Sequence, residues 1–413
     1  MNFEEKLALY AKLIVHWGMN VQIGQDVYIG AEVIHRDFVH KIVEEAYEAG
    51  ARFVNIELID PRNNRTRILK TQNKDDLAYV PAFIPFRYNN MIPEGAASLR
   101  ILGSEYPDIL SDLDPNSVQK VEVNFKKSLK KFYEEAIGHS KVHWTLAAAA
   151  TPAWSKKVFP NLEENSAKEA LWNEIFRICR VDKENCLELW KIHNTLLSTR
   201  AQKLTDLQIK YLYFTGPSTH LKIGISPLAR FKGGVSKSPS GQAFSPNLPT
   251  EECFTTPNYH LTEGYVRTTR PFLINGKMIR GLNLTFEKGE ITQFSADEGE
   301  ETFSAYIASD SGSRRLGEVA LVGIDSPIYQ SGLIFEEILF DENAACHIAI
   351  GFAYRFCIKG SENMSPEELA SAGCNTSNVH TDMMISSDEV DVFAELYNGE
   401  KVPLIEKGSW RDF

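Results

Sequence analysis

The sequence predicts an α/β fold for the first half of the chain and a β-rich α+β fold for the second half. Strand-like and helix-like segments alternate in the first half, whereas short strands and hairpin turns dominate the second half. The length of 413 residues also exceeds that of one typical domain, which contains roughly 100–200 residues. Two domains are therefore expected.

The first half begins with a strand–helix–strand pattern. Residues 27–30 are a short apolar strand candidate, and residues 37–50 carry apolar side chains at helical spacing before a terminal glycine. Residues 52–59 are the next strand candidate, and this order implies a parallel sheet with a right-handed crossover. The alternation recurs as far as residue 212. We therefore predict a doubly wound α/β domain over residues 1–215.

The pattern changes after residues 213–217. Asn275 and Gly276 separate two short apolar runs, which is a strong hairpin signal, and a Lys-Gly pair at 288–289 marks a further turn. A domain boundary is therefore expected near residue 216. Residues 216–413 are expected to form a mixed-sheet, β-rich domain.

Composition excludes several classes of protein. The formal net charge of −11 argues against a nucleic-acid partner, because binding phosphates needs a basic face. Glu4 and Glu5 stand where a signal peptide would carry positive charge. Apolar runs fall far short of the roughly 20 residues of a membrane span. The six cysteines form no C-x-x-C pair, which fits a reducing compartment. We expect a cytoplasmic protein without nucleic-acid or membrane partners.

Several common catalytic motifs are missing from the sequence. The first strand is not followed by G-x-G-x-x-G, and the Walker pattern G-x-x-x-x-G-K-[ST] does not occur. Neither the G-x-S-x-G nucleophile elbow nor the H-E-x-x-H zinc motif is present. Any metal chemistry therefore needs another arrangement of ligands.

Two acidic segments of the second half are candidates for such an arrangement. Glu251 and Glu252 lie between two prolines, and in an extended segment their side chains point to opposite faces, so one of them is expected to reach a given site. A solvated acidic turn is the stronger interpretation of this segment alone. Glu318 directly precedes an apolar run, as either a surface residue at a strand end or an inward-facing ligand.

Two histidine segments complete the set. His347 lies among small apolar residues, where a histidine is usually a hydrogen-bonded core residue, but Asp341 and Glu342 lie close in sequence and unpaired buried charge is costly. His380 and Asp382 are two residues apart, which places both on one face of a strand. This pair suits a divalent metal ion, and a simple hydrogen-bonded pair on a sheet surface is an equal alternative.

Together these segments offer the ligands of a two-metal site, in which a bridging carboxylate holds two cations that share and activate a water. A metal hydrolase is therefore one hypothesis. A peptide- or small-molecule-binding protein without catalysis is a second, with the same residues serving structure. A metal hydrolase of another amide or of a phosphoester is a third.

Four motifs resemble, in order, those of the aminopeptidase T family of metallopeptidases, which includes aminopeptidase S: NLPTEECFTTP, LGEVALV, LFDENAACHIAIGFAYRF and NTSNVHTDMMI. The resemblance extends over essentially the whole chain in length and layout. It implies an N-terminal α/β domain and a C-terminal metal domain. It also implies a homodimer that encloses the active sites in a cavity for short peptides.

The resemblance also implies the site. Glu251 is the candidate general base, with the reverse order of Glu251 and Glu252 left open, and Tyr354 matches the active-site tyrosine. Two divalent ions per subunit are implied, drawn from Zn²⁺, Co²⁺, Mn²⁺ and Mg²⁺. The implied metal ligands are Glu252, Glu318, His347, His380 and Asp382, with Glu342 as a further candidate.

The expected function follows from this set. We predict a metal-dependent aminopeptidase that releases N-terminal amino acids from peptides with a free N-terminus, through a water activated by two metal ions. Tyr354 is expected to donate a hydrogen bond to the tetrahedral oxyanion.

Overall fold

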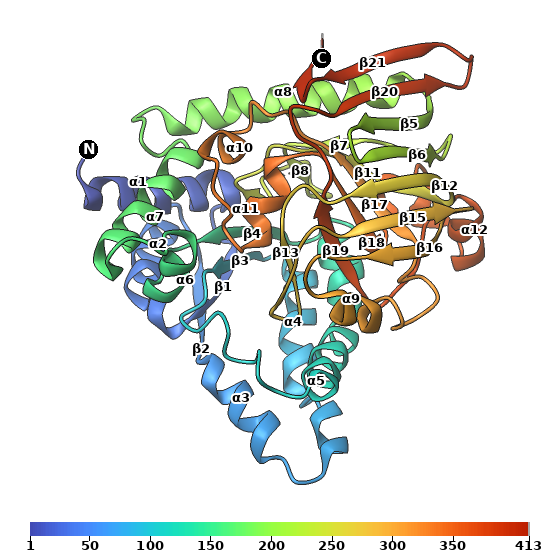
Figure 1. Cartoon of the computed structure of the whole chain (residues 1–413). Helices are drawn as coiled ribbons and strands as arrows, with labels where there is room; N and C mark the ends of the chain where they lie inside the picture. Colours follow the sequence, from blue (N-terminus) through green and yellow to red (C-terminus); the bar gives the residue numbers. More distant parts are fainter. Residues whose placement is uncertain (412–413) are drawn as a thin grey trace. The chain divides into compact units, whose positions relative to one another are not determined.

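The computed structural model describes residues 1–411 and divides the chain into two compact units (Figure 1). The first unit comprises Met1–Ile192 and Val235–Pro249. The second comprises His193–Gly234 and the chain from Thr250 onward. No helix within residues 1–411 has the length and apolar character needed to cross a membrane.

The first unit is built on a five-stranded sheet in which neighbouring strands pair in parallel (Figure 1). In sheet order the strands are β10 (Asn247–Leu248), β4 (His143–Ala148), β3 (Ala97–Leu102), β1 (Asp26–Glu32) and β2 (Phe53–Ile59). The chain starts at β1, moves outward to β2, and then crosses back to β3 and β4. The order therefore reverses beside β1, as it does in doubly wound sheets.

Helices connect these strands. The connection from β1 to β2 contains α2 (Arg36–Glu48), the one from β2 to β3 contains α3 (Pro61–Lys70) and α4 (Phe83–Glu94), and the one from β3 to β4 contains α5 (Pro115–Ser128). Because β2 and β3 flank β1 on opposite sides, right-handed crossovers place α2 on one face and α4 on the other. The remaining helices of this unit are α1 (Phe3–Leu13), α6 (Pro152–Val158) and α7 (Glu164–Ile178), and α8 (Cys186–Asp206) leads into the second unit.

The second unit contains two larger antiparallel sheets. The five-stranded sheet has the order β19 (His380–Met384), β18 (His347–Gly351), β17 (Leu316–Leu321), β11 (Cys253–Thr255) and β7 (Lys232–Gly233). The eight-stranded sheet has the order β16 (Glu290–Ser295), β15 (Asn283–Glu287), β12 (Pro257–Arg267), β6 (Thr219–Ile225), β5 (Ile209–Gly216), β20 (Asp391–Leu396), β21 (Lys401–Glu406) and β22 (Ser409–Trp410). The predicted fold class, a doubly wound α/β domain followed by a β-rich domain, is confirmed.

Both turns singled out in the sequence join adjacent strands. Asn275 and Gly276 connect β13 (Phe272–Ile274) to β14 (Lys277–Ile279) with φ angles of 51° and 77°. Lys288 and Gly289 connect β15 to β16 with φ angles of 50° and 80°. Two successive positive φ angles are typical of the tight turns whose twist matches that of the flanking strands.

One apolar core joins the two larger sheets of the second unit. It contains Phe214 of β5, Val319 and Leu321 of β17, Ile348 of β18 and Met383 of β19, all completely buried. Since side chains alternate along a strand, the other face of the five-stranded sheet carries the intervening residues. That face holds the candidate site.

The division into units differs in detail from the boundary expected near residue 216. That position is the last residue of β5, which pairs with β6 in the eight-stranded sheet. Residues 235–249 return to the first unit, where β10 pairs with β4. Strand pairing, rather than a change in composition, sets the limits of the units.

We expect Phe214→Ala to lower the free energy of unfolding of the second unit by about 3–5 kcal/mol, because it removes a buried aromatic ring and leaves a cavity. Phe214 is 0% exposed. Guanidinium unfolding followed by near-UV circular dichroism measures the change. Tyr265→Ala, at a side chain that is 52% exposed in the same sheet, is the matched control. Equal losses in both variants would contradict the assigned core.

Candidate metal centre

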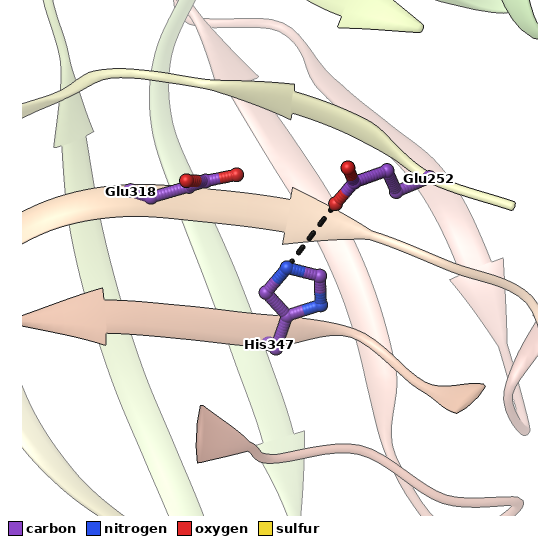
Figure 2. A group of neighbouring side chains, drawn as sticks. All are labelled: Glu252, Glu318 and His347. Carbon is purple, nitrogen blue, oxygen red and sulfur yellow. Dashed lines mark ion pairs between the residues drawn. The ribbon is translucent and has the colours of Figure 1, made fainter. Parts of the chain in front are cut away.

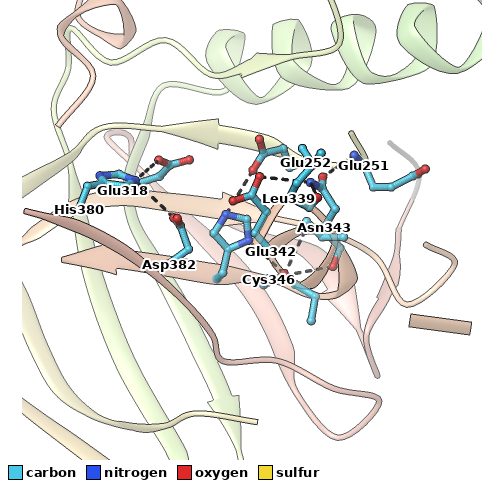
Figure 3. A network of polar contacts seen from close by, with 12 residues as sticks. Glu251, Glu252, Glu318, Leu339, Glu342, Asn343, Cys346, His380 and Asp382 are labelled. Atoms are coloured by element: carbon cyan, nitrogen blue, oxygen red, sulfur yellow. Dashed lines mark hydrogen bonds and ion pairs between the residues drawn. The ribbon is translucent and has the colours of Figure 1, made fainter. Parts of the chain in front are cut away.

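Five candidate ligands lie together on one face of the five-stranded sheet (Figures 2 and 3). Glu252 immediately precedes β11, Glu318 lies in β17, and His347 is the first residue of β18. His380 and Asp382 are the first and third residues of β19. Because β19, β18, β17 and β11 are successive strands of the sheet, residues distant in sequence become neighbours.

Strand register places these side chains on the same face. Ala349 pairs with Glu318 on one side and with Asp382 on the other, and Ala320 pairs with His347. Directly paired residues in adjacent strands point to the same face. The small alanine side chains between the charged ones leave the space above the sheet to the carboxylates and imidazoles.

The five residues form two overlapping groups. Glu252, Glu318 and His347 have ligand atoms within 4.8 Å of one another, and so do Glu318, His380 and Asp382. His347 Nε2 lies 3.2 Å from Glu252 Oε2 (Figure 2). His380 Nε2 lies 3.5 Å from Glu318 Oε2 and 3.4 Å from Asp382 Oδ1 (Figure 3). Glu318 is common to both groups.

Backbone carbonyls orient both imidazole rings. His347 Nδ1 lies 3.2 Å from Ala345 O, and His380 Nδ1 lies 2.7 Å from Phe352 O. A carbonyl oxygen only accepts, so each Nδ1 carries the hydrogen and each Nε2 faces the carboxylates. This is how metal-binding histidines are usually held, with the second ring nitrogen fixing the tautomer.

The carboxylates of the site disturb one another electrostatically. Burial, followed by the charges of Glu252 and Asp382, raises the pKa of Glu318 well above its usual value. Burial and the charges of Asp382, Glu252 and Glu318 do the same to the pKa of Glu342. Burial opposes ionisation of Asp382, but the charge of His380 lowers its pKa. A site with this excess of buried negative charge needs a positive partner.

The pKa values of the two histidines are also raised, which for an imidazole favours the charged form. Burial would lower the pKa of His347, but the hydrogen bond and charge of Glu252 raise it. For His380 the charge of Asp382 likewise outweighs burial and raises the pKa. Each imidazole is therefore drawn to hold a positive charge at Nε2, either as a proton or as a metal ion.

The donor set fits a divalent metal ion. Within residues 1–411 the ion partners of Glu252, Glu318 and Asp382 are histidines and not Lys or Arg. Glu252 Oε2 is buried without a well-aligned hydrogen bond, its nearest partner being His347 Nε2. Carboxylate oxygens with imidazole nitrogens are ligands that Zn²⁺, Co²⁺ and Mn²⁺ accept.

The other three predicted site residues are Glu342, Tyr354 and Glu251, and each lies in different surroundings. Glu342 begins the 3₁₀ helix η5 (Glu342–Ala344) and lies close enough to the acidic ligands for their charges to act on it. The ring of Tyr354 lies 5.3 Å from that of His380, centroid to centroid. The carboxylate of Glu251 lies 3.3 Å from His193 Nε2 and points away from the cluster (Figure 3).

Sequence reasoning did not single out some residues of the site. Asn343 is buried between the segments of Glu251 and Glu342 and hydrogen-bonds to both. Phe254, Phe352 and Phe356 surround the ring of Tyr354, with centroids 5.2–6.0 Å from it. Asn343 stands inside the FDEN motif, but its partners in the folded chain have no signature in sequence.

Fold and site together define a protein with a buried carboxylate–imidazole centre on a β-rich domain, which is the architecture of a metal-dependent hydrolase. The model of the thermophilic metalloprotease (M29) family matches residues 3–410. The chain belongs to this family, and it is a peptidase.

Several aminopeptidases are similar to this protein over nearly the whole chain. Aminopeptidase PepS of Streptococcus thermophilus is 37% identical over 410 residues, covering 99% of this chain and 98% of the relative. Aminopeptidase T of Thermus aquaticus is 38% identical over 408 residues, with 99% of each chain covered. The solved structure of wild-type AmpT from Thermus thermophilus has a TM-score of 0.92 and 35% identity, covering 99% of this chain and 100% of that one. The predicted family is confirmed.

We expect binding of a divalent ion to release protons. In the metal-free protein the raised pKa of Glu318 keeps a proton bound above its usual value of 4.5, and the raised pKa values of His347 and His380 do so above 6.5. Metal ligands must lose these protons. Calorimetric titration with Zn²⁺ at about pH 6.5, in two buffers of different ionisation enthalpy, counts the protons.

The same shifts set the stability of the metal-free protein. In the folded protein Glu318 and Glu342 keep protons that they would release at lower pH in the unfolded chain. Their contribution to stability is therefore full below pH 4.5, and it is lost as pH rises through their raised pKa values in the folded protein. The lowered pKa of Asp382 has the opposite effect, since its contribution to stability is lost as pH falls below its usual value of 3.8.

In the calorimetric titration, heats of Zn²⁺ binding that do not depend on the buffer would contradict this account of the site.

Proposed function

We propose that the protein is a metal-dependent aminopeptidase that uses two divalent ions. The observation that carries the proposal is the position of Glu318, whose carboxylate belongs to both candidate ligand groups. A carboxylate shared in this way is what a two-metal site requires. The names of the relatives, which are aminopeptidases, support release of N-terminal residues as the reaction.

Each ion has its own set of residues in this proposal. Glu252, Glu318 and His347 would hold one ion, and Glu318, His380 and Asp382 the other. When bound, such ions lower the pKa of water and polarise a peptide carbonyl. Zn²⁺, Co²⁺, Mn²⁺ and Mg²⁺ are the proposed choices, since carboxylates and imidazoles suit all four to different degrees.

Tyr354 is proposed to stabilise the negative charge that develops on the carbonyl oxygen. Burial, followed by the charges of Glu318 and Asp382, raises the pKa of its phenol well above the usual value. The phenol therefore stays protonated at neutral pH and donates a hydrogen bond. A donor that is already in place when the charge develops lowers the barrier by a few kcal/mol.

Glu342 is the best-placed carboxylate for proton transfer. It lies beside both ligand groups, belongs to neither, and has a raised pKa. Where bound ions neutralise the charges of the ligands, Glu342 would be ionised, and it would then take the proton of the attacking water and pass it to the leaving amine. Glu251 was the candidate base, but its carboxylate lies against His193. We therefore assign Glu252 of this pair as the ligand and give proton transfer to Glu342.

Recognition of a free N-terminus would follow from the charge of the site. Glu252, Glu318, Glu342 and Asp382 are acidic, and their neighbours include two imidazoles but no Lys or Arg ion partner within residues 1–411. A free α-amine would be held by a metal ion or by a carboxylate of the site, whereas an acylated N-terminus offers neither contact.

Two further features belong to the proposal. All six cysteines are free and buried, which supports a reducing, cytoplasmic environment. A homodimer is proposed because the family resemblance implies one.

The wild-type protein should remove N-terminal residues stepwise from short peptides and amino-acid p-nitroanilides. EDTA should stop the reaction, and Co²⁺, Zn²⁺ or Mn²⁺ should restore it. Glu318→Ala should lose both ions, because both groups need this carboxylate, whereas His347→Ala should keep one. Elemental analysis of the dialysed proteins measures the stoichiometry, and Glu287→Ala, an exposed carboxylate of β15, is the control.

Two outcomes would reject parts of this proposal. Full metal content and activity in Glu318→Ala would show that the ligand assignment is wrong. Equal hydrolysis of N-acetylated and free peptides would show a metal hydrolase of other amides in place of an aminopeptidase.

Tyr354→Phe should lower kcat about 100-fold, the effect typical of losing one oxyanion donor, with unchanged metal content. Tyr397→Phe removes a phenol hydroxyl that bonds Ile225 O elsewhere in the second unit and should leave kcat unaltered. A normal kcat in Tyr354→Phe would remove the donor role.

The same assay on Glu342→Gln separates two roles of Glu342. Loss of metal from the variant would make Glu342 a ligand, whereas a lowered kcat with full metal content supports proton transfer.

A further inference from the structure

The side chain of Asn343 connects two acidic segments of the candidate metal centre. It lies in η5 beside Glu342 and is 0% exposed (Figure 3). A buried amide stabilises a fold only when its donors and acceptor find partners. Asn343 satisfies that condition through three side-chain hydrogen bonds.

The orientation of this amide is fixed by its partners. The backbone N–H of Glu251 donates to Asn343 Oδ1 over 2.7 Å, and a backbone N–H can only donate. Asn343 Nδ2 donates to Leu339 O over 3.0 Å, and a carbonyl can only accept. Exchanging the oxygen and nitrogen would therefore break both bonds.

The acceptor end of the amide holds the segment that carries Glu252. The strand β11 begins at Cys253, so Glu251 and Glu252 lie before the first paired residue of the sheet. The Asn343 side chain provides the N–H of Glu251 with a partner that a neighbouring strand would otherwise supply. On its other side the segment is held by His193 Nε2, 2.8 Å from Thr250 O.

The donor end of the amide holds Glu342. Asn343 Nδ2 lies 3.4 Å from Glu342 Oε1, the longest of the three bonds. The acidic neighbours of Glu342 are Asp382, Glu252 and Glu318. A donor directed at one oxygen of this carboxyl group favours a single orientation among like charges.

We propose that Asn343 is a positioning residue that sets the spacing between Glu252 and Glu342, and through Glu252 the metal affinity of the group formed with Glu318 and His347. The inference rests on the proposed function, because it assumes that this group binds a metal ion. Partners of this kind, one shell outside the ligands, typically change metal affinity by roughly 10- to 100-fold when they are removed.

The test compares metal affinity in Asn343→Ala, Ser326→Ala and the wild type. Ser326 Oγ donates to the backbone carbonyl of Asn343 over 2.6 Å, so Ser326→Ala removes a buried bond to the same residue but leaves the amide intact. Co²⁺ is titrated into each metal-free protein and followed by its visible absorption. Thermal unfolding of the metal-free proteins shows whether each variant is folded.

We expect the affinity of one Co²⁺ ion to fall by about 10- to 100-fold in Asn343→Ala, and that of both ions to change by less than about threefold in Ser326→Ala. If Asn343→Ala does not unfold cooperatively, Asn343→Ser, which cannot reach all three partners, takes its place with the same expected loss. Unchanged affinity in the folded variant, or equal losses in the serine control, would overturn the positioning role. A wild-type protein that binds no Co²⁺ would overturn the proposed function together with this inference.

Discussion

The repulsion among buried carboxylates on one face of the five-stranded sheet is the interaction around which the second unit is arranged. Glu318 lies between the charges of Glu252 and Asp382, and its raised pKa records the cost of that position. Burying several like charges is expensive unless a positive partner neutralises them. The two imidazoles reduce this cost, and a divalent ion in each ligand group would reduce it further.

The rest of the unit holds those charges in place against their repulsion. Val319 and Leu321 alternate with Glu318 and Ala320 along β17, so that one face of the strand joins the apolar core while the other carries the ligand. The eight-stranded sheet completes that core from the far side. A rigid, dry support of this kind keeps ligands within the narrow geometry that metal binding requires.

Local patterns in the sequence were sufficient for part of this arrangement. The spacing of His380 and Asp382 predicted one face of a strand, and both lie in β19 with their side chains converging (Figure 3). The adjacency of Glu251 and Glu252 predicted that one of them would face the site, and their carboxylates have different partners. Alternation along strands is a local property, so sequence alone reveals it.

Pairing between segments that are distant in sequence could not be predicted from these local patterns. The return of residues 235–249 to the first unit depends on β10, a two-residue strand with no periodicity to detect. Asn343 bonds a backbone N–H 92 residues away in sequence, and an asparagine in a polar motif reads equally well as part of a turn. The order of strands in the five-stranded sheet, which brings the two histidines to one centre, likewise comes from pairing and not from spacing.

The backbone pairing differs among the ligands. Glu318 lies in β17, the middle strand of five, and pairs with Ala349 of β18. His347 pairs with Ala320 of β17 and with Met384 of β19, so the sheet holds its backbone on both sides. Glu252 lies just before β11, outside these pairings, and its segment depends on the hydrogen bond that the N–H of Glu251 donates to Asn343 Oδ1. The ligand that the sheet fixes least is therefore the one whose position a substitution outside the ligand set can change.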